Sequence, residues 1–213
     1  MAKKKQKVPE KKSNMTIVYL VIYAVLAVLF IAAMAFYFTS NPPQKPQDIS
    51  QDIFQPAPGK VKIVEFMKFD CIHCYNLHKE MPRILEKYGD RAQIVYVPII
   101  FPKQSTKSIE AYIIAEQMGK GEEMRDALFT AKFEKGMDIM ESTLALENAA
   151  ASVDLGADFN SKLERGDARK AALSNLALMN KYGVDSTPTT FVNGKQIGPT
   201  TTDIDKSISS LLG

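Results

Sequence analysis

The 213-residue chain contains only two cysteines, only two histidines and no tryptophan. Both cysteines and one histidine lie in the stretch "FDCIHCY", residues 69–75. A structural zinc site needs four ligands, and only the two histidines could add further nitrogen or sulfur ligands to the cysteines. His73 lies between the two cysteines, where it is poorly placed to bind the same ion. The shortage of ligands therefore argues against structural zinc.

Charged residues are absent between Lys12 and Lys45. Residues 16–38, inside this gap, form an apolar run long enough to cross a bilayer as a helix of about 20 residues. A cleaved signal peptide is the alternative, but the apolar core of a signal peptide usually has only about 7–15 residues. We therefore expect one retained N-terminal transmembrane helix over residues 16–38.

Residues 1–15 carry six lysines and one glutamate. Because positive residues flanking a membrane helix stay inside, this segment is expected to be a cytoplasmic tail, with everything after residue 38 outside. Removing its net charge of +5 from the chain's +3 leaves −2 for the remainder, which argues against binding to nucleic acid. Residues 39–59 contain five prolines and are expected to form an extended linker to a domain over residues 60–213.

The start of this domain has the pattern of two strands joined by a helix. Val61–Met67 alternates like a strand and places Glu65 on a face with apolar neighbours. Asp70 is a suitable N-cap for the helix that follows, and Ala92–Ile100 has the character of a second strand. This order predicts a parallel βαβ unit.

Residues from about 105 to 182 show no strand pattern and are expected to form a helical insertion. Near the C-terminus, Asn193-Gly194 separates two short strands and suits a type I′ hairpin, and Thr202–Leu212 has the pattern of a helix. The domain is therefore expected to be α/β, with helices interrupting a small mixed sheet. The amphipathic segments of the insertion are Thr106–Met118, Gly121–Lys132, Leu144–Ala151 and Ala168–Tyr182.

The two cysteines at a helix start suit redox chemistry better than a structural disulfide, because closing a two-residue loop stabilises the fold little. The first turn of a helix favours a thiolate, so Cys71 is expected to be the exposed nucleophile, with Cys74 more enclosed as the resolving thiol. A protonated His73 would strengthen this effect. Asp70 opposes it, because a neighbouring anion raises the pKa of a thiol.

Glu65 has two interpretations. As a strand residue it could face water, or it could be a buried carboxylate that relays protons to or from Cys74. For His78 the sequence offers no titratable partner on the same helix face, so we expect a surface or partly packed side chain.

Three segments in order resemble the DsbA-like thiol:disulfide oxidoreductases of the thioredoxin fold: "VEFMKFDCIHCYNLH", "EEMRDALFTAKF" and "GVDSTPTTFVNGKQIGP". The resemblance covers about Val61 to Gly213. It implies a thioredoxin-like fold with an inserted helical subdomain, here preceded by the transmembrane helix. It also implies that Cys71 is the nucleophile, Cys74 the resolving cysteine and His73 the stabiliser of the thiolate.

Further roles follow from the same resemblance. Glu65 matches the buried acid of the family, and Pro188 matches a cis-proline that packs against the disulfide. Thr187 is expected to offer its backbone to a bound substrate. Two positions depart from the family pattern: Ile72 stands where strongly oxidising members have proline, and Asp70 stands where an uncharged residue is common. Both departures bear on the redox potential.

The resemblance implies a bacterial inner-membrane enzyme whose domain lies in the periplasm or outside the cell. It is expected to pass the Cys71–Cys74 disulfide to folding proteins that contain cysteines, without a bound cofactor or metal. A quinone-linked membrane partner, DsbB-like or VKOR-like, would reoxidise it. One alternative is a disulfide reductase or isomerase kept reduced by a membrane donor. Another is a thiolate metal carrier, which predicts stoichiometric Cu(I) or zinc on the reduced domain.

Overall fold

The computed structural model describes residues 14–40 and 53–213. These residues belong to two separate compact units, Met1–Pro43 and Gln44–Gly213. Residues 1–13 of the predicted basic tail and residues 41–52 of the predicted linker lie outside the described residues.

Helix α1, Asn14–Ser40, contains the predicted membrane span of residues 16–38. Large apolar side chains along its middle are exposed, including Leu20 at 65% and Phe30 at 67%. Across residues 14–40 and 53–213, no helix meets both the length and the hydropathy of a membrane span. The transmembrane helix therefore stays a prediction from the sequence.

The second unit is built on a four-stranded mixed sheet with the strand order β2-β1-β3-β4. The first two strands are parallel, which confirms the predicted βαβ unit, and the other pairs are antiparallel. The strands are β1 Val61–Met67, β2 Ala92–Pro98, β3 Thr189–Val192 and β4 Lys195–Ile197. The two central strands, β1 and β3, are almost entirely buried, so polar side chains on them lie inside the protein.

The β3-β4 hairpin turns at the predicted Asn193-Gly194 pair. These residues have φ angles of 46° and 81°, and a type I′ turn requires positive φ at both central positions. Asn193 also holds the turn to β1, because its side-chain Oδ1 accepts a hydrogen bond from the backbone N–H of Lys62 at 2.8 Å.

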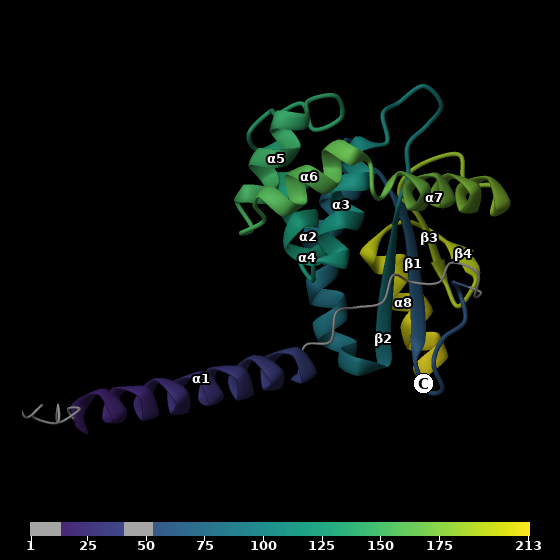
Figure 1. Cartoon of the computed structure of the whole chain (residues 1–213). Helices are drawn as coiled ribbons and strands as arrows, with labels where there is room; N and C mark the ends of the chain where they lie inside the picture. Colours follow the sequence, from purple (N-terminus) through teal and green to yellow (C-terminus); the bar gives the residue numbers. More distant parts are fainter. Residues whose placement is uncertain (1–13, 41–52) are drawn as a thin grey trace, which may run out of the picture. The chain divides into compact units, whose positions relative to one another are not determined.

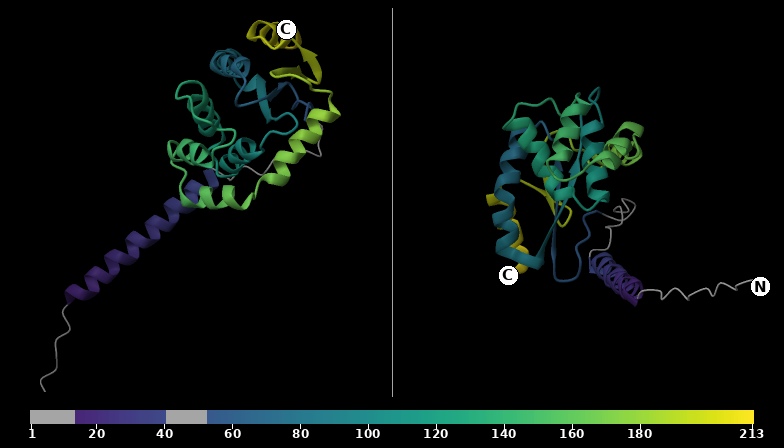
Figure 2. Two further views of the ribbon diagram at one scale, coloured as in Figure 1. Left: turned by 90° about the horizontal axis from the view of Figure 1, so that it is seen from above. Right: turned by 60° about the vertical axis from the view of Figure 1, so that its left-hand side comes forward.

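Helices cover both faces of the sheet (Figures 1 and 2). Seen from above in Figure 2, the sheet lies between α8, Thr201–Leu212, and α7, Arg169–Lys181. Helix α2, Ile72–Tyr88, shares the α8 face and is followed by a short 3-10 helix, Gly89–Arg91. The core on that face includes Val61, Ile63, Leu77, Met81, Ile84, Ile204 and Ile208, and the core beneath α7 includes Val64, Phe66, Val97, Leu178, Met179 and Phe191.

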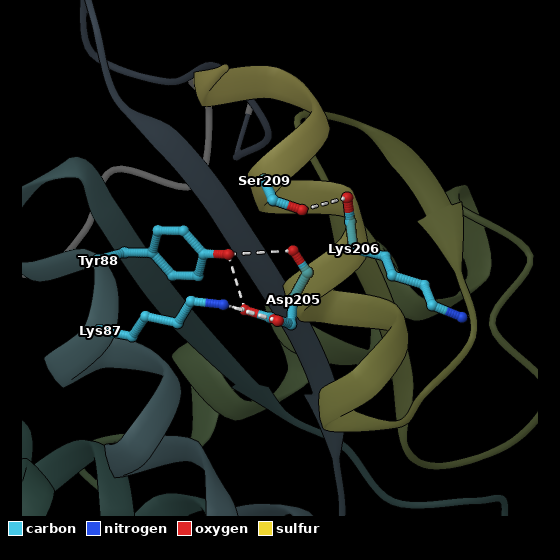
Figure 3. Close-up of polar contacts among 5 residues, drawn as sticks. All are labelled: Lys87, Tyr88, Asp205, Lys206 and Ser209. Atoms are coloured by element: carbon cyan, nitrogen blue, oxygen red, sulfur yellow. Dashed lines mark hydrogen bonds and ion pairs between the residues drawn. The ribbon is translucent and has the colours of Figure 1, made fainter.

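Helices α2 and α8 are joined at their solvent side by a polar cluster around Asp205 (Figure 3). The Asp205 carboxylate accepts hydrogen bonds from Lys87 Nζ at 2.6 Å and from the Tyr88 hydroxyl at 2.7 Å. On α8 itself, the Ser209 hydroxyl donates to the backbone carbonyl of Lys206 at 3.0 Å. The cluster fixes the C-terminal end of α2 against α8, and the opposite end of α2 carries the cysteines.

Five helices lie between β2 and β3: α3 Lys107–Gln117, α4 Gly121–Phe133, α5 Thr143–Ala151, α6 Ala157–Arg165 and α7. The sequence pattern did not predict α6. Only Phe159 and Leu163 of this short helix are buried, so its apolar pattern is a single pair of residues four apart. The main core of the insertion extends to Phe69 and Cys74 at the start of α2.

Candidate active site

Helix α2 begins one residue later than the sequence suggested. Cys71, rather than Asp70, is its N-cap, with extended backbone angles of φ −95° and ψ 115°. The Cys71 sulfur accepts a hydrogen bond from the backbone N–H of Cys74 at 3.4 Å. An N-cap side chain satisfies backbone donors that have no partner within the helix, so the sulfur lies at the positive end of the helix dipole.

The loop before β3 meets this sulfur from a distant part of the sequence. The Cys71 thiol donates a hydrogen bond to the backbone carbonyl of Thr187 at 3.3 Å. The Thr187-Pro188 peptide bond is cis, as the resemblance implied. The fold thus brings Cys71, Thr187 and Pro188 together at one end of the sheet.

The two cysteines, both free thiols in the structure, have opposite acid strengths. The pKa of Cys71 falls to about 5, chiefly because the Cys74 side chain donates a hydrogen bond to its sulfur. The Thr187 side chain and the backbone N–H groups of Cys74 and His73 lower the pKa further, against an opposing effect of burial. The pKa of Cys74 is raised strongly, first by the same hydrogen bond to Cys71 and then by burial. Cys71 is therefore the better thiolate, and Cys74 is 0% exposed.

His73 reaches Cys71 through its backbone. The backbone N–H of His73 stabilises the Cys71 thiolate, and His73 as a residue is exposed to solvent. Ile72, which departs from the family pattern, is also 48% exposed beside the sulfur.

Asp70, expected to oppose the thiolate, has a compensating cation. Lys68 Nζ lies 3.2 Å from Asp70 Oδ1, and both side chains are largely enclosed, at 11% and 21% exposure. The Lys68 ammonium also lies 4.9 Å from the centroid of the Phe101 ring. Pairing reduces the field that the Asp70 carboxylate exerts on the Cys71 sulfur, because an adjacent opposite charge offsets it.

Glu65 is buried, at 1% exposure, and not on a solvent-facing side of the strand. It lies on the α2 side of the sheet with Ile63, and its Oε2 has no hydrogen-bond partner among the residues described. Burial raises the pKa of Glu65 to about 8, while the charge of Arg125 lowers it and that of Cys71 raises it slightly. A carboxyl group with this pKa can gain or lose a proton near neutral pH.

His78 is half-buried, in agreement with the expectation of a surface or partly packed side chain, and its partners come from another helix. Its Nε2 lies 3.0 Å from Asp126 Oδ1, and its Nδ1 accepts a hydrogen bond from Arg125 Nε at 3.3 Å. Its ring stacks on Phe129, with centroids 4.8 Å apart. Burial first, and then the charge of Arg125, lower the pKa of His78 to about 4. These partners lie on α4, so they could not be found on the helix face that carries His78.

Sequence reasoning also missed Lys68 and Arg125 themselves. The only sequence signal for Lys68 was its position two residues before Asp70. Arg125 offered a clearer signal: it lies three and four residues before Leu128 and Phe129, so it belongs to the apolar stripe of α4. A charged residue on such a stripe indicates a buried ion.

No group of three or more His, Cys, Asp or Glu side chains in the described parts of the chain is arranged to hold a metal ion. The site combines a stabilised thiolate at the start of α2, a buried thiol one helical turn later and a buried carboxyl group on the central strand β1.

A family model described as thioredoxin matches residues 57–209, which is well over half of the chain. The chain belongs to this thioredoxin family. It is 25% identical over 161 residues to the thiol:disulfide interchange protein DsbA of Burkholderia cepacia, covering 72% of each chain. It is 28% identical to the protein of the same name from Pseudomonas aeruginosa over 153 residues, 70% of each chain.

Among solved structures, the oxidoreductase DsbA of Xylella fastidiosa superposes with a TM-score of 0.60. The match has 24% sequence identity and covers 73% of this chain and 84% of that one, so it shows the fold. Together these comparisons confirm the DsbA-like, thioredoxin-fold character inferred from the sequence.

The contacts of Cys71 predict its reactivity. Alkylation of the reduced protein by iodoacetamide should rise with pH to a plateau, with a midpoint near pH 5, because the thiolate predominates above the pKa of Cys71. Mass spectrometry should find the label on Cys71 and not on buried Cys74. A midpoint near the ordinary thiol value of 9.0 would contradict the hydrogen-bond assignment.

Two variants separate the Lys68–Asp70 pair from the other contacts. Lys68→Met should move the midpoint upward, because the Asp70 carboxylate then acts on the thiolate without compensation. The double change Lys68→Met with Asp70→Asn should return it toward the wild-type value.

Proposed function

We propose that this protein is an extracytoplasmic thiol oxidase that introduces disulfide bonds into folding proteins. The chain is a thiol:disulfide oxidoreductase, the activity that its DsbA-named relatives carry. The observation that supports the oxidising direction best is the Cys71 sulfur at the start of α2, with its pKa lowered to about 5. Stabilising this thiolate stabilises the reduced form of the cysteine pair, which makes the Cys71–Cys74 disulfide a stronger oxidant.

The exchange begins with the oxidised pair. A substrate thiolate attacks Cys71 Sγ, the bond between Cys71 and Cys74 breaks, and Cys74 leaves with the electron pair as a thiolate that takes up a proton. A second substrate thiolate attacks the substrate sulfur of the mixed disulfide, and Cys71 leaves as a thiolate. The substrate has then lost two electrons and gained a disulfide. A quinone-linked membrane partner, DsbB-like or VKOR-like, accepts the two electrons from the reduced pair.

The surrounding residues have distinct proposed roles. Thr187 presents its backbone carbonyl beside Cys71, where an extended substrate chain could pair with it, and the cis peptide bond to Pro188 follows directly. Glu65 exchanges the proton of Cys74, supported by its pKa of about 8 and its influence on the pKa of Cys74. His73 stabilises the thiolate through its backbone N–H.

Membrane attachment is the second part of the proposal. The support is the charge-free run of residues 16–38, the helical conformation of α1 and the exposed apolar side chains along its middle. The basic tail would hold the N-terminus in the cytoplasm of a bacterial inner membrane, with the catalytic domain in the periplasm or outside the cell.

Alkaline carbonate extraction of cell membranes tests this attachment. The full chain should stay in the membrane pellet, because a spanning helix resists extraction that releases peripheral proteins. A variant that lacks residues 1–40 but carries a cleavable signal peptide should appear in the soluble fraction. Release of the full chain by carbonate would refute the anchor.

The roles of the two cysteines can be separated by trapping. Cys74→Ala should accumulate mixed disulfides with substrate proteins, because the Cys71 thiolate can still attack a substrate disulfide, whereas no Cys74 thiol remains to attack Cys71 Sγ and release the substrate thiolate. Cys71→Ala should accumulate far fewer, because Cys74 is fully buried. Non-reducing gels of cells expressing each variant give the comparison, and equal trapping by both would overturn the assignment.

The resting redox state distinguishes an oxidase from a reductase or isomerase. Rapid acid quenching followed by a maleimide of high mass should show Cys71 and Cys74 mostly as a disulfide in living cells. A mostly reduced pair would indicate instead an enzyme kept reduced by a membrane electron donor. Cells depleted of quinone should shift the pair toward the reduced form if the proposed partner supplies the oxidising equivalents.

A further inference from the structure

Arg125, on helix α4 of the insertion, is a cation buried next to the sheet. It is 8% exposed, and its guanidinium carbon lies 4.0 Å from the centroid of the Tyr96 ring. Tyr96 is the register partner of Glu65 in the parallel β1-β2 pair, so the two side chains project from the same face of the sheet. The guanidinium therefore lies over the strand position beside Glu65.

The carboxylates that form ion pairs with Arg125 do not bury its positive charge. Arg125 Nη2 is 3.7 Å from Glu122 and 4.0 Å from Asp126, whose side chains are 80% and 59% exposed. Ion pairs of that length with exposed partners are weak. Burying a charge is costly unless an opposite charge and hydrogen bonds compensate it.

Glu65 has the complementary property. It is buried, and neither its Oε2 nor the hydroxyl of Thr190, its cross-strand partner on β3, has a hydrogen-bond partner within the described residues. Arg125 is the largest influence that favours its charged form. A buried cation of the insertion thus lies over Tyr96, the strand neighbour of the buried acid Glu65.

We propose that Arg125 is a positioning residue that stabilises the ionised form of Glu65. Through Arg125, the docked helical insertion determines whether this carboxyl group is ionised and able to accept the proton of Cys74. The inference rests on the function proposed above for Glu65. It gives the insertion a part in the redox chemistry, because α4 carries the cation while β1 and α2 carry the acid and the cysteines.

Several groups share this environment and bear on its pH dependence. The charge of Cys71 acts on Glu65, the charge of Glu65 acts on Cys74, and Tyr96 lies beside Glu65 on β2. The groups coupled to Arg125 are His78 on α2, Tyr112 and Glu116 on α3, and Glu122 and Asp126 on α4. His78 has a pKa of about 4 and stays neutral near pH 7, so it adds no competing positive charge there.

The sign of the effect follows from the charges. Arg125 favours the carboxylate, so its removal should raise the pKa of Glu65 above its present value of about 8. Fewer molecules would then carry an ionised Glu65 at pH 7. Loss of the proton from Cys74, and with it the attack of Cys74 on a mixed disulfide, would become slower.

The test follows the Glu65 carboxyl carbon by NMR in full-length reduced protein in detergent micelles, labelled with ¹³C at glutamate carboxyl groups. Glu65→Gln identifies the signal. Arg125→Met should raise the titration midpoint by about one pH unit or more, and Arg125→Lys, which keeps the charge, should leave it near the wild-type value. Arg165→Met, which removes an exposed cation of the same insertion, is the matched control and should have no effect.

Arg125→Gln carries the same prediction as Arg125→Met and retains a donor for His78, in case the apolar variant does not fold. An unchanged Glu65 midpoint in a folded Arg125→Met or Arg125→Gln protein would overturn the inference.

A kinetic measurement separates this inference from the proposed role of Glu65. Resolution of a preformed mixed disulfide on Cys71 should be slower in Arg125→Met at pH 7, and Arg125→Met should add no further slowing to Glu65→Gln. If Glu65→Gln leaves resolution at the wild-type rate while Arg125→Met still moves the NMR midpoint, the charge pairing stands and the proton-relay role fails.

Discussion

The acid strengths of the two thiols depend on the position of the Cys71 sulfur as the cap at the start of helix α2. As the N-cap of α2, the Cys71 sulfur accepts a hydrogen bond from the backbone N–H of Cys74. A second hydrogen bond, from the Cys74 side chain, gives the largest stabilisation of the Cys71 thiolate. The hydrogen bond between the two side chains thus lowers the pKa of Cys71 and raises that of Cys74. The same contact makes the two sulfurs unequal, which is what a nucleophile and a resolving thiol require.

The sheet changes the acid strength of a second group, Glu65, by burying it. Glu65 lies on a central strand, where desolvation moves its pKa into the physiological range. A carboxyl group in such a place would ordinarily remain neutral, and Arg125 on the insertion opposes that tendency. The insertion contacts the redox helix as well, since Tyr75 and His78 of α2 pack against Phe129 of α4. The inserted helices therefore pack directly against the helix that begins at the cysteines.

Local pattern was sufficient for much of the fold. The bounds of β1, the parallel βαβ unit, the Asn193-Gly194 turn and the helices with several apolar contacts agree with the sequence-based expectations. Helix α6 was missed because it buries only two apolar side chains. The N-cap was misplaced by one residue because Asp70 has the stronger intrinsic preference, yet its carboxylate pairs with Lys68 and leaves the cap to Cys71.

The sequence by itself determined the chemical elements of the site: two cysteines one helical turn apart, a glutamate in an apolar strand and a Thr-Pro pair before the last hairpin. Tertiary structure decided their surroundings. Only the fold brings Thr187 to a cysteine 116 residues away, buries Glu65, and places Arg125 over Tyr96, the strand neighbour of Glu65. Residue spacing along a chain predicts contacts within one helix or strand. The pKa values depend instead on burial and on charges from every element packed nearby.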